Sequence, residues 1–320
     1  MTKLLRHLPL LASELLLGTS LAIAFAALNA QAAPVATTTV TGANIDWLQA
    51  AVLGMVQGLT EFIPISSTAH LKVVPVALGW GDPGVTFSAA IQLGSIAAVL
   101  WYFWGDLVTL ARGTAIAIAK RHWQADDLRM SAGIALGTIP IVVIGLAMKA
   151  FIPDLDNAPI RSLPAIAIAS IVMGILLGLA EKFGRRQRGF EQLSARDGIL
   201  MGFAQALALI PGVSRSGSTI TAGLFMSLDR ATAARFSFLL GIPAITLAGL
   251  VQLKTDVIDA GVSVAELTPL LVGILSAAVF SYLAIAWLIH FLQTQSTWVF
   301  VWYRTLFGLA ILAVLSFQQL

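Results

Sequence analysis

The sequence of 320 residues contains no cysteine and few charged side chains. Without cysteine there is no disulfide bond, no thiolate metal ligand and no cysteine nucleophile, although this absence says nothing about the redox compartment. Charged residues make up 11% of the chain, whereas soluble domains carry about 25%. Hydrophobic residues make up 58%. We therefore expect an all-α integral membrane protein, because apolar runs of spanning length cross a bilayer as helices.

Several catalytic signatures are missing as well. The chain has no G-x-S-x-G sequence and no separate carboxylate that would orient a histidine, which argues against a Ser-His-Asp hydrolase. It has no P-loop, which argues against a kinase or NTPase. The net charge is only +3, and the basic residues occur in short loops between apolar runs. Nucleic-acid binding is therefore not expected.

Residues 1–45 differ from the rest of the chain. Lys3 and Arg6 precede an apolar run over residues 8–28, and an Ala30-Gln31-Ala32 sequence and a threonine-rich linker follow. This order is typical of a signal peptide with its cleavage site. The run is also long enough to remain as a membrane anchor, and both readings stay open.

Residues 46–320 are predicted to form a single membrane catalytic domain. Six apolar runs are long enough to span a bilayer, near residues 85–105, 130–152, 162–181, 232–252, 267–289 and 298–317. Two further apolar segments, 46–79 and 198–228, are broken at Pro64 and at Pro211-Gly212. Proline ends a helix because it lacks an N–H and disfavours the helical conformation before it. We read both segments as re-entrant helix pairs.

The loop charges predict the orientation. Two loops are basic, and their cationic residues are Arg112, Lys120, Arg121 and Arg129, then Lys182, Arg185, Arg186, Arg188 and Arg196. The loops 153–161 and 253–266 each hold one cation beside their acidic residues. By the positive-inside rule the basic loops are cytoplasmic and the acidic loops face outward. Residues 33–45 and the C-terminus are then outside.

The two broken segments also form an internal repeat. Gly54-x-x-Gln57 followed by Ile63-Pro64 recurs as Gly202-x-x-Gln205 followed by Ile210-Pro211. Repeat one covers about 46–155 and repeat two about 198–320. Three full spans separate the broken segments, so the second is expected to enter from the opposite face. Such an inverted-topology repeat brings broken helices together near the membrane middle.

The first break carries most of the polar groups. Gln57 lies one helical turn before Glu61, so both side chains share a face and can hold a hard cation. Ser66, Ser67 and Thr68 supply hydroxyls, and His70 follows them. The alternatives are structural: a neutral or ion-paired Glu61, a packing amide at Gln57, helix caps at the hydroxyls and a core histidine.

The second break, Pro211–Thr219, combines serines with an arginine. Ser214, Ser216 and Thr219 can cap the following helix, whose N-terminus attracts anions. Arg215 adds a guanidinium suited to phosphate oxygens, unless it lies at a cytoplasmic lip as an ordinary basic residue. An anion site, a carboxylate, hydroxyls and an imidazole together fit phosphoryl transfer. We expect Glu61 and Arg215 to meet in one chamber.

These stretches resemble the bacterial undecaprenyl-diphosphate phosphatase family, also called bacitracin resistance proteins. Its signatures, Gln/Glu-Gly-x-Thr-Glu-Phe-x-Pro-x-Ser-Ser-x-x-His and Pro-Gly-x-Ser-Arg-Ser-Gly-x-Thr, match residues 57–70 and 211–219. Family-like stretches also begin at Gln92, Arg235 and Tyr303, and the likeness covers roughly residues 46–320. One departure is Ala69, where the family usually has glycine before the histidine.

The resemblance implies hydrolysis of undecaprenyl (polyprenyl) diphosphate to the monophosphate lipid carrier for cell-wall synthesis, with bacitracin resistance. It implies a multi-pass protein of the bacterial inner membrane with a site open to the outer face. A divalent cation, Mg²⁺ or Ca²⁺, and in many members a homodimer are also implied.

The resemblance also implies roles for single residues. Glu61 and Gln57 are expected at the metal or diphosphate, His70 as acid or base, and Arg215 at phosphate. Ser67 is the expected nucleophile if the mechanism is covalent, with Ser66 and Ser214 as the next candidates; attack by water stays open. The remaining substrate-binding residues are expected to be Ser66, Thr68, Ser214, Ser216 and Thr219.

Two other functions remain as alternatives. Inverted repeats with broken helices are also a transporter design, so the chain is a candidate for moving a lipid phosphate between leaflets. A purely structural membrane scaffold is the third reading, but it leaves Arg215 and Glu61 buried without a purpose. Release of phosphate in detergent distinguishes an enzyme from a transporter.

Overall fold

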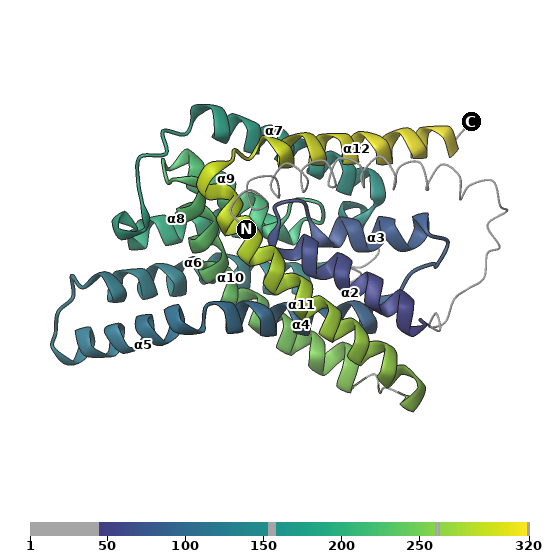
Figure 1. Ribbon diagram of the computed structural model, residues 1–320, viewed down its shortest axis with the longest axis horizontal. Coiled ribbons are helices and arrows are strands. Elements are labelled where there is room, and N and C mark those ends of the chain that lie inside the picture. Colours follow the sequence, from purple (N-terminus) through teal and green to yellow (C-terminus); the bar gives the residue numbers. More distant parts are fainter. Residues whose placement is uncertain (1–44, 153–157, 260, 262, 319–320) are drawn as a thin grey trace, which may run out of the picture.

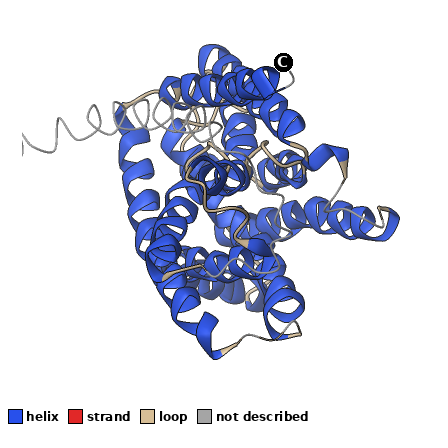
Figure 2. Cartoon of the chain, turned by 90° about the vertical axis from the view of Figure 1, so that its right-hand side faces the viewer, coloured by secondary structure: helices blue, strands red, loops and turns tan. Residues whose placement is uncertain are grey.

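The computed structural model describes residues 45–152, 158–259, 261 and 263–318. This part of the chain is helical, with loops and no strand (Figure 2). Its α-helices are α2 (Trp47–Phe62), α3 (Ser67–Ala77), α4 (Gly84–Tyr102), α5 (Trp104–Ala119), α6 (Asp126–Phe151), α7 (Leu163–Phe183), α8 (Ala195–Ala206), α9 (Arg215–Phe225), α10 (Arg230–Gln252), α11 (Val264–Thr294) and α12 (Trp298–Gln318). The expected signal peptide or anchor lies outside the described residues, as does most of the acidic loop at 153–161.

Six of the described helices are long and apolar enough to cross a membrane. They are Gly84–Tyr102, Asp126–Phe151, Leu163–Phe183, Arg230–Ile258, Glu266–Thr294 and Trp298–Phe317. Large apolar side chains such as Trp101, Phe151 and Val264 remain more than three-quarters exposed. A surface of this kind requires lipid as its solvent. The expectation of an all-α, multi-pass membrane protein with six spans is confirmed.

The segment between the first two spans differs from the expectation. It was expected to be a basic loop, but Trp104–Ala119 forms α5, which continues from α4 after a break at Phe103. α5 and α6 form a hairpin that projects to the left in Figure 1. Thr114 Oγ1 and Ser131 Oγ join the two helices at 2.7 Å. The apolar residues around Arg112 sustain a helix, so only the turn near Lys120 remains a loop.

Both predicted breaks exist, and each separates a helix pair. In the first pair, α2 ends at Phe62 and α3 begins at Ser67. In the second pair, α8 ends at Ala206, a short 3-10 turn follows, and α9 begins at Arg215. Ser66 and Ser214, directly before α3 and α9, have φ angles of 77° and 70°. A non-glycine residue rarely adopts such angles. The two breaks therefore share one strained backbone feature.

Each broken helix pair packs against a long helix of the membrane domain. α2 packs on α11, α8 packs on α6, and α7 lies beside α12 along the top of Figure 1. Gly202 allows the α8 contact, because a Cβ there would collide with the backbone of Gly137 on α6. Small residues permit such close helix approach in membranes. Each broken pair is thus held by a long helix from the other half of the chain.

Candidate functional site

The two breaks meet through a pair of opposite charges. Arg215, the first residue of α9, donates from Nη2 to Glu61 Oε1 at 3.3 Å. Both side chains are 11% exposed. A charge inside a membrane protein is costly and normally functional. The expected meeting of Glu61 and Arg215 is confirmed, and the buried, ion-paired Arg215 is not an ordinary exposed basic residue.

Glu61 is the centre of a hydrogen-bond network. Its Oε2 accepts from Ser67 Oγ at 2.7 Å and from Gln57 Nε2 at 3.1 Å. Gln57 Nε2 also donates to Ser95 Oγ at 3.5 Å, and Ser281 Oγ donates to Ser95 Oγ at 2.8 Å. The short bond from Ser67 places a hydroxyl proton directly on a carboxylate. This is the geometry of a nucleophile with its general base.

A cavity of about 370 Å³ opens beside this network. The two breaks contribute Gln57, Glu61, Ser66, Ser67, Thr68, Ser214 and Arg215 to its polar lining, and α4 contributes Ser88 and Gln92. Lys72, Asp82 and Arg161 line it as well, from later in α3 and from the loops after α3 and before α7. Ile141 and Ile245 contribute apolar wall. The cavity can hold a charged head group next to an apolar chain.

The hydroxyls of the second break mostly hold the backbone. Ser214 Oγ accepts from the N–H of Gly217 at 3.1 Å, so Ser214 caps α9 as expected. Ser216 Oγ donates to the carbonyl of Ile63 at 3.2 Å, which ties the two breaks together. Thr219 Oγ1 donates to the carbonyl of Arg215 at 2.8 Å. Only Ser214 of these three lines the cavity. Ser66, by contrast, makes no side-chain cap at α3.

His70 lies behind the cavity wall and not in its lining. Its Nδ1 is 2.7 Å from the carbonyl oxygen of Ser66, and its Nε2 is 2.6 Å from Tyr303 Oη. A carbonyl only accepts, so Nδ1 carries the proton in the neutral ring and Nε2 accepts from Tyr303. The ring also stacks on Phe307 with centroids 4.4 Å apart. In this arrangement both nitrogens are engaged away from Glu61.

Arg304 lies in the family-like stretch that begins at Tyr303, but no role at the site was predicted for it. Its buried guanidinium donates to the carbonyls of Pro64 at 2.9 Å, Gly212 at 2.7 Å and Val213 at 2.9 Å. These carbonyls belong to both breaks. An arginine inside an apolar run is a functional signal by itself, so the Tyr303-Arg304 pair was detectable from the sequence.

The donor set bears on the expected divalent cation. No group of three or more His, Cys, Asp and Glu side chains gathers as a metal cage among the described residues. Glu61 and Gln57 supply one carboxylate and one amide. Mg²⁺ commonly binds through one or two carboxylates plus substrate phosphates and keeps several waters. The residues therefore fit a cation that binds together with a diphosphate.

Comparisons with known proteins agree with the resemblance drawn from the two signatures. The family model described as "Bacitracin resistance protein BacA" matches residues 50–310. The undecaprenyl-diphosphatase of Trichormus variabilis is 69% identical over 269 residues, which cover 84% of this chain and 84% of the relative. The proteins of the same name from Synechocystis sp. and Synechococcus elongatus are 63% and 62% identical over 275 and 273 residues. Those matches cover 86% and 85% of this chain, and 84% and 94% of the relatives. This chain belongs to the bacitracin resistance protein BacA family.

Proposed function

We propose that this chain hydrolyses undecaprenyl diphosphate to undecaprenyl monophosphate and phosphate in the cavity between the two breaks. It is a membrane-bound hydrolase that recycles the lipid carrier of cell-wall synthesis, and its family is named for bacitracin resistance. The observation that carries the proposal is the joining of Glu61, Ser67 and Arg215 at one cavity wall.

The chemistry follows from these three groups. Glu61 accepts the hydroxyl proton of Ser67 as Ser67 Oγ bonds to the terminal phosphorus. The bond between that phosphorus and the bridging oxygen breaks, and undecaprenyl monophosphate leaves. The departing monophosphate takes the proton from Glu61, which is then free to deprotonate a water molecule that attacks the phosphoserine phosphorus. The bond between phosphorus and Ser67 Oγ breaks, Glu61 returns the proton to Oγ, and phosphate leaves. Arg215 and the N-termini of α3 and α9 neutralise the charge that develops on the phosphoryl oxygens.

His70 has a supporting role in this proposal. Both of its ring nitrogens are hydrogen-bonded to groups outside the cavity lining, which supports a positioning role. The acid–base role expected from the sequence stays a prediction. Its Nδ1–H holds the carbonyl of Ser66, the residue before the nucleophile. A divalent cation near Glu61 and Gln57, when bound, would neutralise the diphosphate further.

The finer topology is part of the proposal. The spans α4, α6 and α7 separate the two broken pairs, so the second pair enters from the opposite face and the repeat is inverted. The matched backbone of Ser66 and Ser214 supports this. The cavity lining includes Asp82 and Arg161 from loops on the side assigned to the outside by charge. The site therefore opens to the outer face.

Purified protein in detergent tests the activity. Phosphate release from a long polyprenyl diphosphate is expected for the wild type, whereas a transporter releases nothing. Arg215→Ala and Glu61→Ala are each expected to lower kcat about 10²–10³-fold, the usual effect of removing such an electrostatic partner. Arg129→Ala is the control, since the Arg129 side chain is 48% exposed and forms only a long surface ion pair. Near wild-type rates in both site variants would refute the assignment.

The role of Ser67 needs its own measurement. Ser67→Ala is expected to abolish a phosphoserine that rapid acid quenching traps in the wild type. If no phosphoenzyme forms in the wild type and Ser67→Ala keeps its kcat, water and not Ser67 attacks the phosphorus.

A further inference from the structure

Lys72 brings a further positive charge to the cavity lining, and the chemistry above does not use it. Ser67, Thr68, Leu71 and Lys72 line the cavity from one face of α3. Lys72 follows Ser67 by five residues, which corresponds to about 7.5 Å along a helix axis. The cavity lining therefore carries Arg215 beside Ser67 and, farther from the breaks, Lys72 on α3 together with Arg161 directly before α7.

The surroundings of Lys72 hold its ammonium near the loops. Its Nζ donates to the carbonyl oxygen of Arg161 at 3.0 Å, and the side chain is partly buried. This bond uses one of the three N–H donors of a lysine. A carbonyl carries no net charge, so the bond orients the ammonium without neutralising it. The lining contains two acidic residues, Glu61 and Asp82, and Asp82 belongs to the loop after α3.

A diphosphate has two phosphates that need separate partners. With the terminal phosphate at Ser67 and Arg215, the inner phosphate and its isoprenoid chain must lie farther from the two breaks. Within the lining, Lys72 is the lysine on that part of the wall. Charge-assisted bonds from an ammonium to phosphate oxygens are strong and short.

We propose that Lys72 binds the inner phosphate of the substrate, the one that remains on the isoprenoid after hydrolysis. The proposal rests on the function proposed above, which places the terminal phosphate at Ser67. It makes Lys72 a residue that favours lipid diphosphates over monophosphates, because a monophosphate has no inner phosphate for Lys72 to bind. Because the product keeps the same phosphate, Lys72 also holds the product.

A purely structural role gives different results. If Lys72 only fastened α3 to the loop before α7, a neutral donor would suffice. Lys72→Gln keeps an N–H donor for the carbonyl of Arg161 but removes the charge, whereas Lys72→Arg keeps the charge. The two variants therefore separate binding of phosphate from fastening of the loop.

The test is steady-state kinetics in detergent with farnesyl diphosphate, with farnesyl monophosphate and inorganic phosphate as inhibitors. Lys72→Gln is expected to raise KM about tenfold with kcat unchanged, because an interaction present in both ground and transition states is lost. The inhibition constant of farnesyl monophosphate is expected to rise by a similar factor, and that of inorganic phosphate to stay unchanged. Lys72→Arg should remain near wild type. Lys254→Gln is the control, because the Lys254 side chain is 72% exposed and pairs with Asp259.

Three results would overturn the proposal. The first is a KM in Lys72→Gln equal to that of the Lys254→Gln control. The second is a change confined to the inhibition constant of inorganic phosphate, which would assign Lys72 to the transferred phosphate. The third is a lower unfolding temperature with unchanged KM, which would leave only the loop contact. Failure of the proposed chemistry appears instead as retained kcat in the Arg215 and Ser67 variants.

Discussion

At the scale of single residues, the site depends on two strained serines. Ser66 and Ser214 hold positive φ angles, and such angles cost about 1–3 kcal/mol each. Side-chain donors hold the carbonyls around them: His70 that of Ser66, Ser216 that of Ile63, and Arg304 those of Pro64 and Val213. The strain is therefore maintained by polar groups that contact the backbone and not the cavity.

Tyr303→Phe tests whether His70 positions the first break. The substitution removes only the hydroxyl that Nε2 of His70 accepts from at 2.6 Å. We expect kcat to fall about 3–10-fold with unchanged KM, because the His70 ring is less firmly held. The pH dependence of kcat should keep its shape, because a positioning residue exchanges no proton with the substrate. A histidine acting as general acid or base would instead contribute about 10²–10⁴-fold and define a limb of the pH profile. A changed limb in Tyr303→Phe would therefore restore the acid–base role of His70.

At the scale of elements, the sequence allowed prediction of much of the fold. Pro64 and Pro211 mark the breaks, where polar residues follow the proline. Proline alone does not predict a break, because Pro75, Pro140 and Pro243 lie inside α3, α6 and α10. The α5 helix was missed, since Arg112 and Lys120 were read by their charge, whereas the apolar residues around Arg112 form a helix that packs on α6. The direction of the His70 ring depends on Tyr303 and Phe307, more than 200 residues later. No local pattern contains that information.

The start of α8 predicts how stability depends on pH. Arg188 donates to both carboxylate oxygens of Asp197 at 2.8 and 2.7 Å, and Ser194 donates to Oδ2. Burial alone would raise the pKa of Asp197, but the hydrogen bonds from Arg188 and Ser194 outweigh it and lower the pKa. Because the pKa of Asp197 is lower in the folded state, its ionisation stabilises the fold at pH values above the unfolded-state pKa of about 3.9. This stabilisation is lost as the pH falls through the folded-state pKa.

Thermal unfolding in detergent measures this effect. Asp197→Asn is expected to lower the free energy of unfolding by about 2–3 kcal/mol near neutral pH, somewhat less than a fully buried pair because Arg188 is 31% exposed. The difference from wild type should shrink below about pH 4. Asp126→Asn is the matched control, since the Asp126 side chain is 76% exposed and such pairs contribute about 0–1 kcal/mol. Equal effects of the two substitutions would exclude a stabilising Arg188–Asp197 pair.

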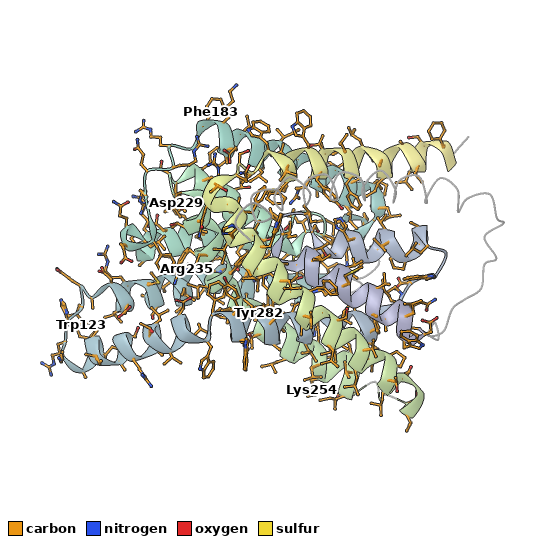
Figure 3. The ribbon with its side chains drawn as sticks, in the orientation of Figure 1. Trp123, Phe183, Asp229, Arg235, Lys254 and Tyr282 are labelled. Carbon is orange, nitrogen blue, oxygen red and sulfur yellow. The ribbon has the colours of Figure 1, made fainter. Side chains whose placement is uncertain are left out.

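At the scale of the whole molecule, the first helix of each broken pair packs on a helix from the other half of the chain. α2 of the first half packs on α11 of the second, and α8 of the second packs on α6 of the first. Figure 3 places Trp123, at the turn between α5 and α6, at the far left of the molecule. Phe183, where the second basic loop begins, lies at the upper left, and Lys254 lies toward the lower right. The basic loops expected inside thus gather at one end of the helices.

The absence of native cysteine makes this arrangement directly measurable. Leu78 follows the first broken pair and Phe225 ends the second, and they are 45% and 48% exposed. In spheroplasts, a membrane-impermeant maleimide is expected to label Leu78→Cys at once and Phe225→Cys only after permeabilisation, because an inverted repeat puts the two pairs on opposite faces. Val264→Cys and Trp123→Cys calibrate the outer and inner sides, being 85% and 65% exposed. Labelling of Leu78→Cys and Phe225→Cys from the same side, in variants that retain phosphatase activity, would rule out the inverted repeat, and protection of Leu78→Cys would place the cavity on the cytoplasmic side.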